Sequence, residues 1–284
     1  MSANDESYDE TLKPGAILNK RYAILKVLGE GSFGVVYQAR DKRLARGRKQ
    51  VAIKQMPMQS IVDCERQADL RATLNHPAIP RIFDYFALDE YSYLVEELVV
   101  GRDLEKVLKE QDGFLPEKTV IGWAIQLCDV LDYLHNHPYH PIIFRDLKPN
   151  NVMVDQNDLV HLIDFGLARA YPPGFFREAQ PQFEHLWKGL AMGTEGYSPP
   201  EQYQGYVKPQ SDIYALGATM HHLLTRRDPR NELPFSFKRN PVRSFNPEVS
   251  KRLEAIVMKA VDLDVEDRFA SAREMQTALE GLRR

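Results

Sequence analysis

Cysteine is nearly absent from this chain of 284 residues, which contains only Cys64 and Cys128. Two isolated thiols fit neither a disulfide framework nor a cysteine-based metal site, so we expect both to be buried and reduced. Long apolar runs are also absent, and the N-terminus lacks the core of a signal peptide. These absences argue against a membrane segment and a secretory leader, so we expect a soluble, cytoplasmic chain.

A strong excess of charge of one sign is missing too. The formal net charge is −3, which argues against general affinity for nucleic acids. With 43% hydrophobic and 27% charged residues, the composition is that of a globular protein that can bury a sizeable core. Residues 1–11 are acidic and almost devoid of apolar side chains, so we predict a disordered acidic tail over residues 1–15. The sequence leaves the oligomeric state open.

The stretch Ile142–Val154 reads as an apolar strand, a polar loop and a second apolar strand. Its loop holds a carboxylate at Asp146, an ammonium at Lys148 and an amide at Asn151. A carboxylate can accept a proton from a hydroxyl, an ammonium can neutralise a phosphate, and an amide oxygen can hold Mg²⁺. Asp164, which opens an Asp-Phe-Gly turn, adds a second oxygen ligand. This set of groups favours phosphoryl transfer to an alcohol.

A glycine-rich turn lies upstream, in the sequence GEGSFGVV over residues 29–36. Glycines of this spacing let backbone N–H groups approach phosphates, either in a hairpin or in a dinucleotide-binding turn that opens a helix. The residues that follow are β-branched and aromatic, which favours a strand and therefore the hairpin. A further strand over Val51–Met56 carries Lys54.

In chain order, the glycine-rich turn, the strand with Lys54, the loop around Asp146 and the Asp-Phe-Gly turn resemble the motifs of the protein kinases. The resemblance is closest to bacterial serine/threonine kinases. The resemblance covers about residues 20–280 and implies a bilobal α+β fold. We expect a small lobe over residues 16–97 with an antiparallel sheet and one main helix, and a larger, mostly helical lobe over residues 98–284. ATP and Mg²⁺ would be the cofactors, and a protein would be the substrate.

The resemblance also implies a role for each motif residue. Asp146 would orient the substrate hydroxyl and accept its proton, Lys148 would neutralise the γ-phosphate, and Asn151 and Asp164 would bind Mg²⁺. Thr194 completes the catalytic set and indicates serine/threonine specificity. The residues expected around the nucleotide are Gly29, Gly31, Ser32, Phe33, Gly34, Val36, Ala52, Lys54, Glu96, Glu97, Val99, Met153 and Asp164.

Apolar periodicity and stop signals place the remaining elements. Strands are expected at 21–28, 35–40, 51–56, 79–87 and 91–99, and helices at 61–74, 103–110, 116–135, 211–225, 251–262 and 271–282. By resemblance, Asp212 should hold the backbone of the loop around Asp146, and Arg268 should pair with Glu201. The histidine usual before Arg145 is replaced by Phe144, which should pack beside Phe165.

Three polar residues depart from the family pattern near Lys54. Gln67 stands where a helix glutamate usually pairs with this lysine, Arg71 stands at a usually apolar position, and Glu96 stands at a usually apolar position behind the adenine. A lone buried carboxylate is costly, so it must be paired or protonated. We therefore expect Glu96 to pair with Lys54, with Arg71 close enough to share it.

Two further departures lie in the large lobe. Residues 167–192 contain no serine or threonine, so we expect Arg145 to meet Glu178 or Glu184 and to order this segment without phosphorylation. Residues 226–252 are rich in proline and lack helical apolar spacing. We expect the family's docking helix there to be absent or a single turn, with Phe235, Phe237 and Phe245 packed inward.

Two alternatives to an active protein kinase stay open. The departures around Lys54 also suit a weakly active kinase or a pseudokinase that binds ATP as a regulatory scaffold. A small-molecule phosphotransferase could share the acid-plus-asparagine loop. The Pro199-Pro200-Glu201 motif, Thr194 and the glycine-rich turn count against this last reading.

Overall fold

The computed structural model describes residues 11–31, 34–43, 49–58, 61–172 and 192–283, and it divides the chain into two compact units. The N-terminal unit takes in Met1–Thr73 and Pro80–Val99, and the C-terminal unit takes in Leu74–Ile79 and Val100–Arg284. The proposed lobes at 16–97 and 98–284 and the proposed tail at 1–15 stay predictions. Most of that tail, and both Glu178 and Glu184, lie outside the described residues.

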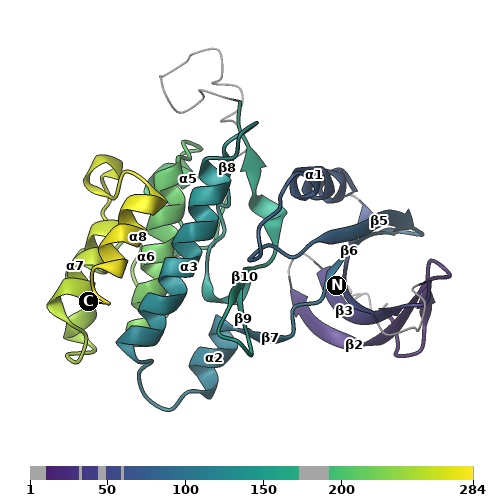
Figure 1. Cartoon of the computed structure of the whole chain (residues 1–284), viewed down its shortest axis with the longest axis horizontal. Coiled ribbons are helices and arrows are strands. Elements are labelled where there is room, and N and C mark those ends of the chain that lie inside the picture. Colours follow the sequence, from purple (N-terminus) through teal and green to yellow (C-terminus); the bar gives the residue numbers. More distant parts are fainter. Residues whose placement is uncertain (1–10, 32–33, 44–48, 59–60, 173–191, 284) are drawn as a thin grey trace, which may run out of the picture. The chain divides into compact units, whose positions relative to one another are not determined.

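An antiparallel six-stranded sheet in the order β1-β2-β3-β4-β6-β5 forms the N-terminal unit. The strands are β1 (Ile17–Leu18), β2 (Tyr22–Gly31), β3 (Gly34–Asp41), β4 (Gln50–Pro57), β5 (Ile82–Leu88) and β6 (Tyr91–Glu97). Among the described residues of this unit there is one helix, α1 (Ile61–Ala72), which packs on β5 and β6 (Figure 1).

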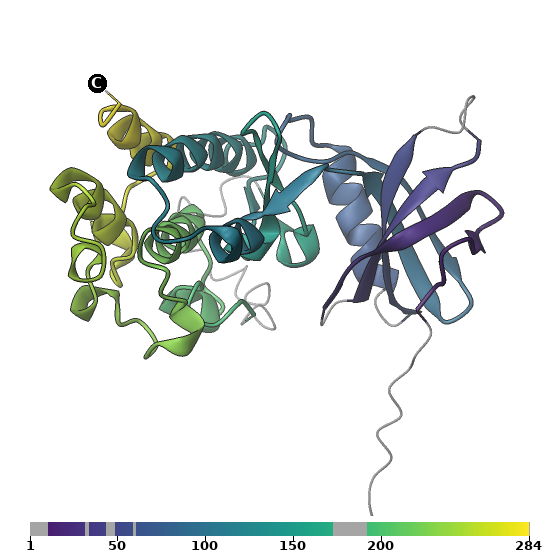
Figure 2. The same ribbon diagram turned by 90° about the horizontal axis from the view of Figure 1, so that it is seen from below.

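Both faces of this sheet are covered by apolar side chains. Val51 and Ile53 of β4 belong to a large cluster on one face, together with Tyr22 and Tyr37. Met56 belongs to a second cluster with Cys64 and Ala68 of α1. Because side chains alternate along a strand, Ala52 and Lys54 share the helix-covered face with Met56. In Figure 2, α1 lies against this helix-covered face of the sheet.

Helices dominate the C-terminal unit. They are α2 (Leu104–Glu110), α3 (Glu117–His135), α5 (Pro200–Tyr203), α6 (Pro209–Thr225), α7 (Lys251–Ala260) and α8 (Ala272–Glu280). The helix α3 packs against α6 and α8, and α7 packs against α6 (Figure 1). The strands β7 (Gly101–Asp103), β9 (Val152–Asp155) and β10 (Val160–Leu162) form a small sheet, and β8 (Ile142–Ile143) pairs with β11 (Arg169–Ala170).

The sheet with one helix and the helical second unit confirm the predicted α+β class, although several boundaries were wrong. The helix predicted to end at Leu74 ends at Ala72, and the strand predicted over 79–87 begins at Ile82. The chain leaves the helix early because His76 and Pro77 form a turn in which Ile79 N–H donates to the carbonyl of His76. In the described part of the chain no helix is both long and apolar enough to cross a membrane.

The prediction for residues 226–252 is largely confirmed. Three single-turn 3₁₀ helices, at Pro229–Asn231, Phe237–Arg239 and Val242–Ser244, occupy this stretch, and α7 begins only at Lys251. Pro229 begins the first of these turns and Pro241 directly precedes the third, positions at which proline is tolerated in a helical turn. Phe237 is buried as expected, whereas Phe235 and Phe245 are only half-buried.

Candidate functional site

The polar loop between β8 and β9 in the C-terminal unit gathers three predicted catalytic residues around one carboxylate. Asp146 is buried, and its Oδ1 accepts a hydrogen bond of 2.6 Å from the hydroxyl of Thr194. Its Oδ2 accepts bonds from Lys148 Nζ at 2.9 Å and from Asn151 Nδ2 at 2.8 Å. Lys148 Nζ also reaches Thr194 Oγ1 at 2.7 Å. A carboxylate held by a cation and two neutral donors is fixed in direction.

The two proposed metal ligands lie on adjoining backbone. Ile163, the residue before Asp164, donates its N–H to the carbonyl of Asn151 at 2.9 Å. The side-chain nitrogen of Asn151 is turned toward Asp146, whose backbone carbonyl it also meets at 2.8 Å. With this nitrogen bonded to Asp146, the amide oxygen remains as the group that could bind a metal ion. An amide oxygen and a carboxylate are the hard donors that Mg²⁺ prefers, so the residues fit that ion.

Asp164 adopts a left-handed backbone conformation with φ of 62°, which is uncommon outside glycine. Its Oδ1 accepts the N–H of Gly166 at 3.2 Å and caps a short 3₁₀ turn over Phe165–Leu167. The ring of Phe165 is buried and meets Phe144 edge to face, with centroids 5.1 Å apart. The predicted packing of Phe144 beside Phe165 is confirmed.

Asp212 on α6 binds the backbone of the loop around Asp146. It is fully buried, and it accepts the backbone N–H of Phe144 at 2.8 Å and that of Arg145 at 2.7 Å. This role was predicted. Its third partner, Nε2 of His135 at 2.8 Å, was not, because a histidine at the end of α3 carries no signal of a contact with a residue far along the chain.

Gln202 on α5 ties the same loop to the segment before Thr194. Its Nε2 donates to the carbonyl of Arg145 at 2.8 Å and to that of Met192 at 2.7 Å. Arg145 itself is buried with φ of 71°, and its Nη1 donates to the carbonyl of Leu167 at 3.3 Å. The sequence reasoning missed Gln202, because a buried glutamine is recognised only by its partners. The predicted contact of Arg145 with an acid of the 173–191 segment lies outside the described residues.

The predicted pair of Glu201 and Arg268 is confirmed. Arg268 Nη1 and Nη2 meet the two carboxylate oxygens at 2.7 and 3.0 Å, and the guanidinium is fully buried. The same arginine donates to the carbonyls of Gln210 and Asp262. These bonds join α5, α6 and the segment after α7, so the pair is structural.

The chain after Thr194 is anchored to α6 by Tyr197. Its hydroxyl lies 2.6 Å from Nδ1 of His222. Burial raises the pKa of Tyr197 and lowers the pKa of His222, so the phenol keeps its proton and the imidazole stays neutral. The neighbouring His221, whose pKa burial also lowers, donates from Nε2 to the carbonyl of Asn240 at 2.7 Å.

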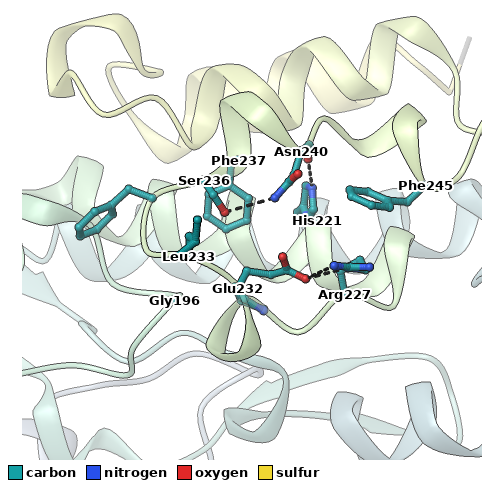
Figure 3. A pocket seen from close by; sticks show the side chains of 11 residues that line it. Gly196, His221, Arg227, Glu232, Leu233, Ser236, Phe237, Asn240 and Phe245 are labelled. Carbon is teal, nitrogen blue, oxygen red and sulfur yellow. Dashed lines mark hydrogen bonds and ion pairs between the residues drawn. The ribbon is translucent and has the colours of Figure 1, made fainter.

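A pocket lies beside this segment, between Gly196 and the loop that follows α6 (Figure 3). Figure 3 shows the rings of Phe237 and Phe245 on either side of His221, and an ion pair of Arg227 with Glu232. The pocket therefore combines an apolar wall with polar groups that are already paired.

The N-terminal unit carries the glycine-rich turn between β2 and β3. Gly34 has φ of +121°, and a Cβ there would lie 1.8 Å from the carbonyl oxygen of Gln55, so only glycine fits. A Cβ at Gly29 or Gly31 would meet nothing within 4 Å. Packing does not require these two glycines, but a ligand that approaches the backbone closely would. Ser32 and Phe33 lie outside the described residues.

Lys54 is buried on β4, on the face covered by α1, and opposite Val36 of β3. The buried positions of α1 are Cys64, Gln67, Ala68 and Arg71, a helical stripe that faces the sheet. The predicted inward direction of Gln67 and Arg71 is thus confirmed.

The carboxylate of Glu96 meets Arg71, with Oε2 2.5 Å from Nη1, which confirms the predicted approach of Arg71. Glu96 lies opposite Ala52 in the sheet, and Lys54 lies opposite Leu94, so Lys54 and Glu96 are diagonal neighbours on one face. The predicted ion pair of Lys54 with Glu96 stays a prediction.

The remaining residues expected around adenine are divided between the units. Glu97 at the end of β6 is exposed, and Val99 beyond it is half-buried. In the C-terminal unit, Met153 lies on β9 opposite Asp103 of β7 and is half-buried.

Comparisons with known proteins agree with the motifs. A family model described as the protein kinase domain matches residues 22–278. A probable serine/threonine-protein kinase of Streptomyces coelicolor is 35% identical over 282 residues, which cover 93% of this chain and 40% of that protein. Serine/threonine-protein kinase B of Synechocystis is 32% identical over 275 residues, covering 93% of this chain and 47% of that protein. The chain thus spans less than half the length of these relatives.

Solved structures show the same architecture. The kinase domain of PknI from Mycobacterium tuberculosis aligns with a TM-score of 0.71 at 24% identity, covering 95% of this chain and 99% of that domain. A double mutant of that domain aligns with a TM-score of 0.73 at 23% identity, over 96% of this chain and all of the mutant domain. These alignments confirm the bilobal fold expected from the motifs.

Proposed function

Because the chain belongs to the protein kinase family, we propose that it transfers the γ-phosphoryl group of ATP to a serine or threonine hydroxyl of a protein. The observation that carries this proposal is the cluster of Asp146, Lys148 and Thr194, in which one buried carboxylate is bonded to an ammonium and a hydroxyl.

In the proposed reaction Asp146 receives the hydrogen bond of the substrate hydroxyl and takes its proton as the oxygen attacks phosphorus. Each carboxylate oxygen has two lone pairs, and Oδ1 carries one bond, from Thr194. The second lone pair can accept the substrate hydroxyl without breaking the cluster. Thr194 therefore orients the carboxylate.

Lys148 neutralises negative charge on the transferred group. Its Nζ is tethered to Asp146 and Thr194, so the cation is held in place before substrate arrives. A preorganised charge costs no reorganisation during the reaction.

Asn151 and Asp164 would hold Mg²⁺, which would neutralise the phosphates of ATP. In the N-terminal unit, the open space over Gly29 and Gly31 supports close approach of phosphates to the backbone, and Lys54 would contact them. The other residues proposed for the nucleotide are Ser32, Phe33, Gly34, Val36, Ala52, Glu96, Glu97, Val99 and Met153.

We further propose a cytoplasmic location, because the reaction needs ATP and because Cys64 and Cys128 are both free and buried. Burial raises the pKa of the Cys64 thiol to about 11, so this thiol is protonated and unreactive at neutral pH.

Consumption of ATP by the purified chain, measured with and without a generic basic protein, tests the proposal. Consumption should depend on Mg²⁺ and on the added protein, and acid hydrolysis of the product should release phosphoserine or phosphothreonine. Phosphotyrosine alone, or transfer to a small alcohol in preference to protein, would contradict the assigned acceptor.

A regulatory scaffold that binds ATP without transferring phosphate is the second candidate. It is favoured by Gln67, a buried amide where the family has a carboxylate. A scaffold would bind Mg-ATP with no turnover, and its binding would be insensitive to replacement of Asp146.

A further inference from the structure

Among the charged side chains of α1 whose burial the structure describes, Arg71 is the most deeply buried, with 1% of its surface exposed. Its Nη1 lies 2.5 Å from Oε2 of Glu96 on β6, and its Nη2 donates to the backbone carbonyl of Pro80, just before β5. One guanidinium therefore connects the last turn of α1 to β6 and to the chain just before β5. The cation also lies at the carboxyl end of the helix, where the helix dipole favours positive charge.

The carboxylate of Glu96 makes this contact through its Oε2. Its side chain is 15% exposed, so water screens the pair only weakly. A buried guanidinium without a carboxylate would be left uncompensated, and the same holds for the carboxylate without the guanidinium. Each residue consequently makes the other necessary.

Gln67 lies one helical turn before Arg71 on the same buried stripe of α1. As a neutral amide it offers no charge to Lys54. The ion pair of Arg71 with Glu96 lies one turn later along the helix and reaches β6, whereas Lys54 lies on β4.

We propose that Arg71 is a positioning residue for the nucleotide site: with Glu96 and the carbonyl of Pro80 it fixes α1 against β5 and β6, in place of a link from α1 to Lys54. The placement of α1 is then built into the N-terminal unit and needs no nucleotide. The effect on ATP rests on the proposed function, whereas the effect on folding does not. In this proposal Glu96 is the ion-pair partner of Arg71, whereas the sequence predicted a pair with Lys54.

A double-mutant cycle separates these two roles of Glu96. Glu96→Met and Arg71→Leu each leave one buried charge without its partner. Each substitution should therefore lower the thermal midpoint of the nucleotide-free chain by roughly 10 °C. The double variant R71L/E96M replaces the ion pair with apolar side chains and should recover most of that loss. Glu65→Met, on an exposed position of α1, is the matched control and should leave the midpoint unchanged.

The KM for ATP provides a readout that a purely structural role would not move. We expect each single variant to raise this KM by about tenfold at a temperature where it is folded, and the double variant to raise it by less than either single variant. Arg71→Lys keeps the charge but lacks the planar fork that serves two partners, so its KM should rise by about threefold. It is the milder variant should the others fail to fold.

Three outcomes would overturn the proposal. A double variant as defective in ATP binding as Glu96→Met would mean that Glu96 serves another cation, such as Lys54. A wild-type KM in Arg71→Lys and in both single variants would leave the pair without influence on the nucleotide site. Unchanged thermal midpoints in the single variants would show that the pair of Arg71 and Glu96 does not fix α1 to the sheet. A wild-type chain that binds no ATP would instead contradict the proposed function while the folding cycle remained valid.

Discussion

The hydroxyl of Thr194 donates a 2.6 Å hydrogen bond to Asp146, across 48 positions of sequence. The bond joins the loop between β8 and β9 to the chain that precedes Tyr197, and Lys148 contacts both residues. The direction of the proposed catalytic carboxylate therefore depends on a residue outside its own loop.

Thr194→Ala should lower kcat by about 10²-fold, because one donor that orients Asp146 is lost. Thr194→Ser keeps the hydroxyl and should stay within about threefold of wild type. Steady-state transfer to a basic protein measures both. Thr277→Ala, which removes an exposed hydroxyl on α8, is the control, and a Thr194→Ala enzyme as active as this control would refute the role.

Stability should fall as the pH drops below about 6.5, the ordinary pKa of histidine. Burial lowers the pKa of both His221 and His222, so the unfolded chain takes up protons in a range where the folded chain does not. The contribution of these two histidines to the free energy of unfolding is fully present above this pH. It is lost as the pH falls toward their pKa in the folded chain.

The urea midpoint at pH 7.5 and at pH 5.5 measures this loss. His222→Gln should reduce the difference between the two values, whereas His140→Gln, at an exposed position, should leave it as in wild type. An undiminished difference in His222→Gln would mean that other groups carry the pH dependence.

Arg268→Leu should destabilise the chain by about 3–5 kcal/mol, because it leaves the carboxylate of Glu201 without its buried partner. Arg273→Leu is the matched control: this arginine pairs with Asp132 at 2.8 Å but is 58% exposed, so its loss should destabilise the chain far less. Urea unfolding compares the two. Equal effects would show that burial of the pair does not set its contribution.

Active protein should carry no essential phosphate between Leu167 and Met192. This range has no serine or threonine, and the hydroxyl of Tyr171 belongs to a side chain that is only 3% exposed. Phosphopeptide mass spectrometry of the active protein, before and after phosphatase treatment, measures this. Loss of activity together with loss of a phosphate from this range would contradict the expectation.

The motif residues were predictable from sequence because short-range chemistry determines them. Asp146, Lys148 and Asn151 lie within one loop, and their types and spacing already indicate phosphoryl transfer. The family's spacing, counted back from Asn75-His76-Pro77, placed Gln67 and Arg71 correctly on the buried side of α1.

The partners that fix the site were not predictable, because they depend on distances between remote parts of the chain. Gln202, His135 and His222 look like ordinary residues until the fold brings them to Arg145, Asp212 and Tyr197. Short elements such as β1 and α5 were missed for the same reason: two to four residues carry too little periodicity, and packing decides their conformation.

Transfer of labelled γ-phosphate from ATP to protein by Asp146→Asn, compared with wild type, tests the central claim most directly. The substitution keeps the size of the side chain and removes its negative charge and its ability to take a proton. We predict that transfer by the variant falls by at least about 10²-fold while its affinity for Mg-ATP stays within about threefold of wild type. Undiminished transfer by Asp146→Asn would contradict the account.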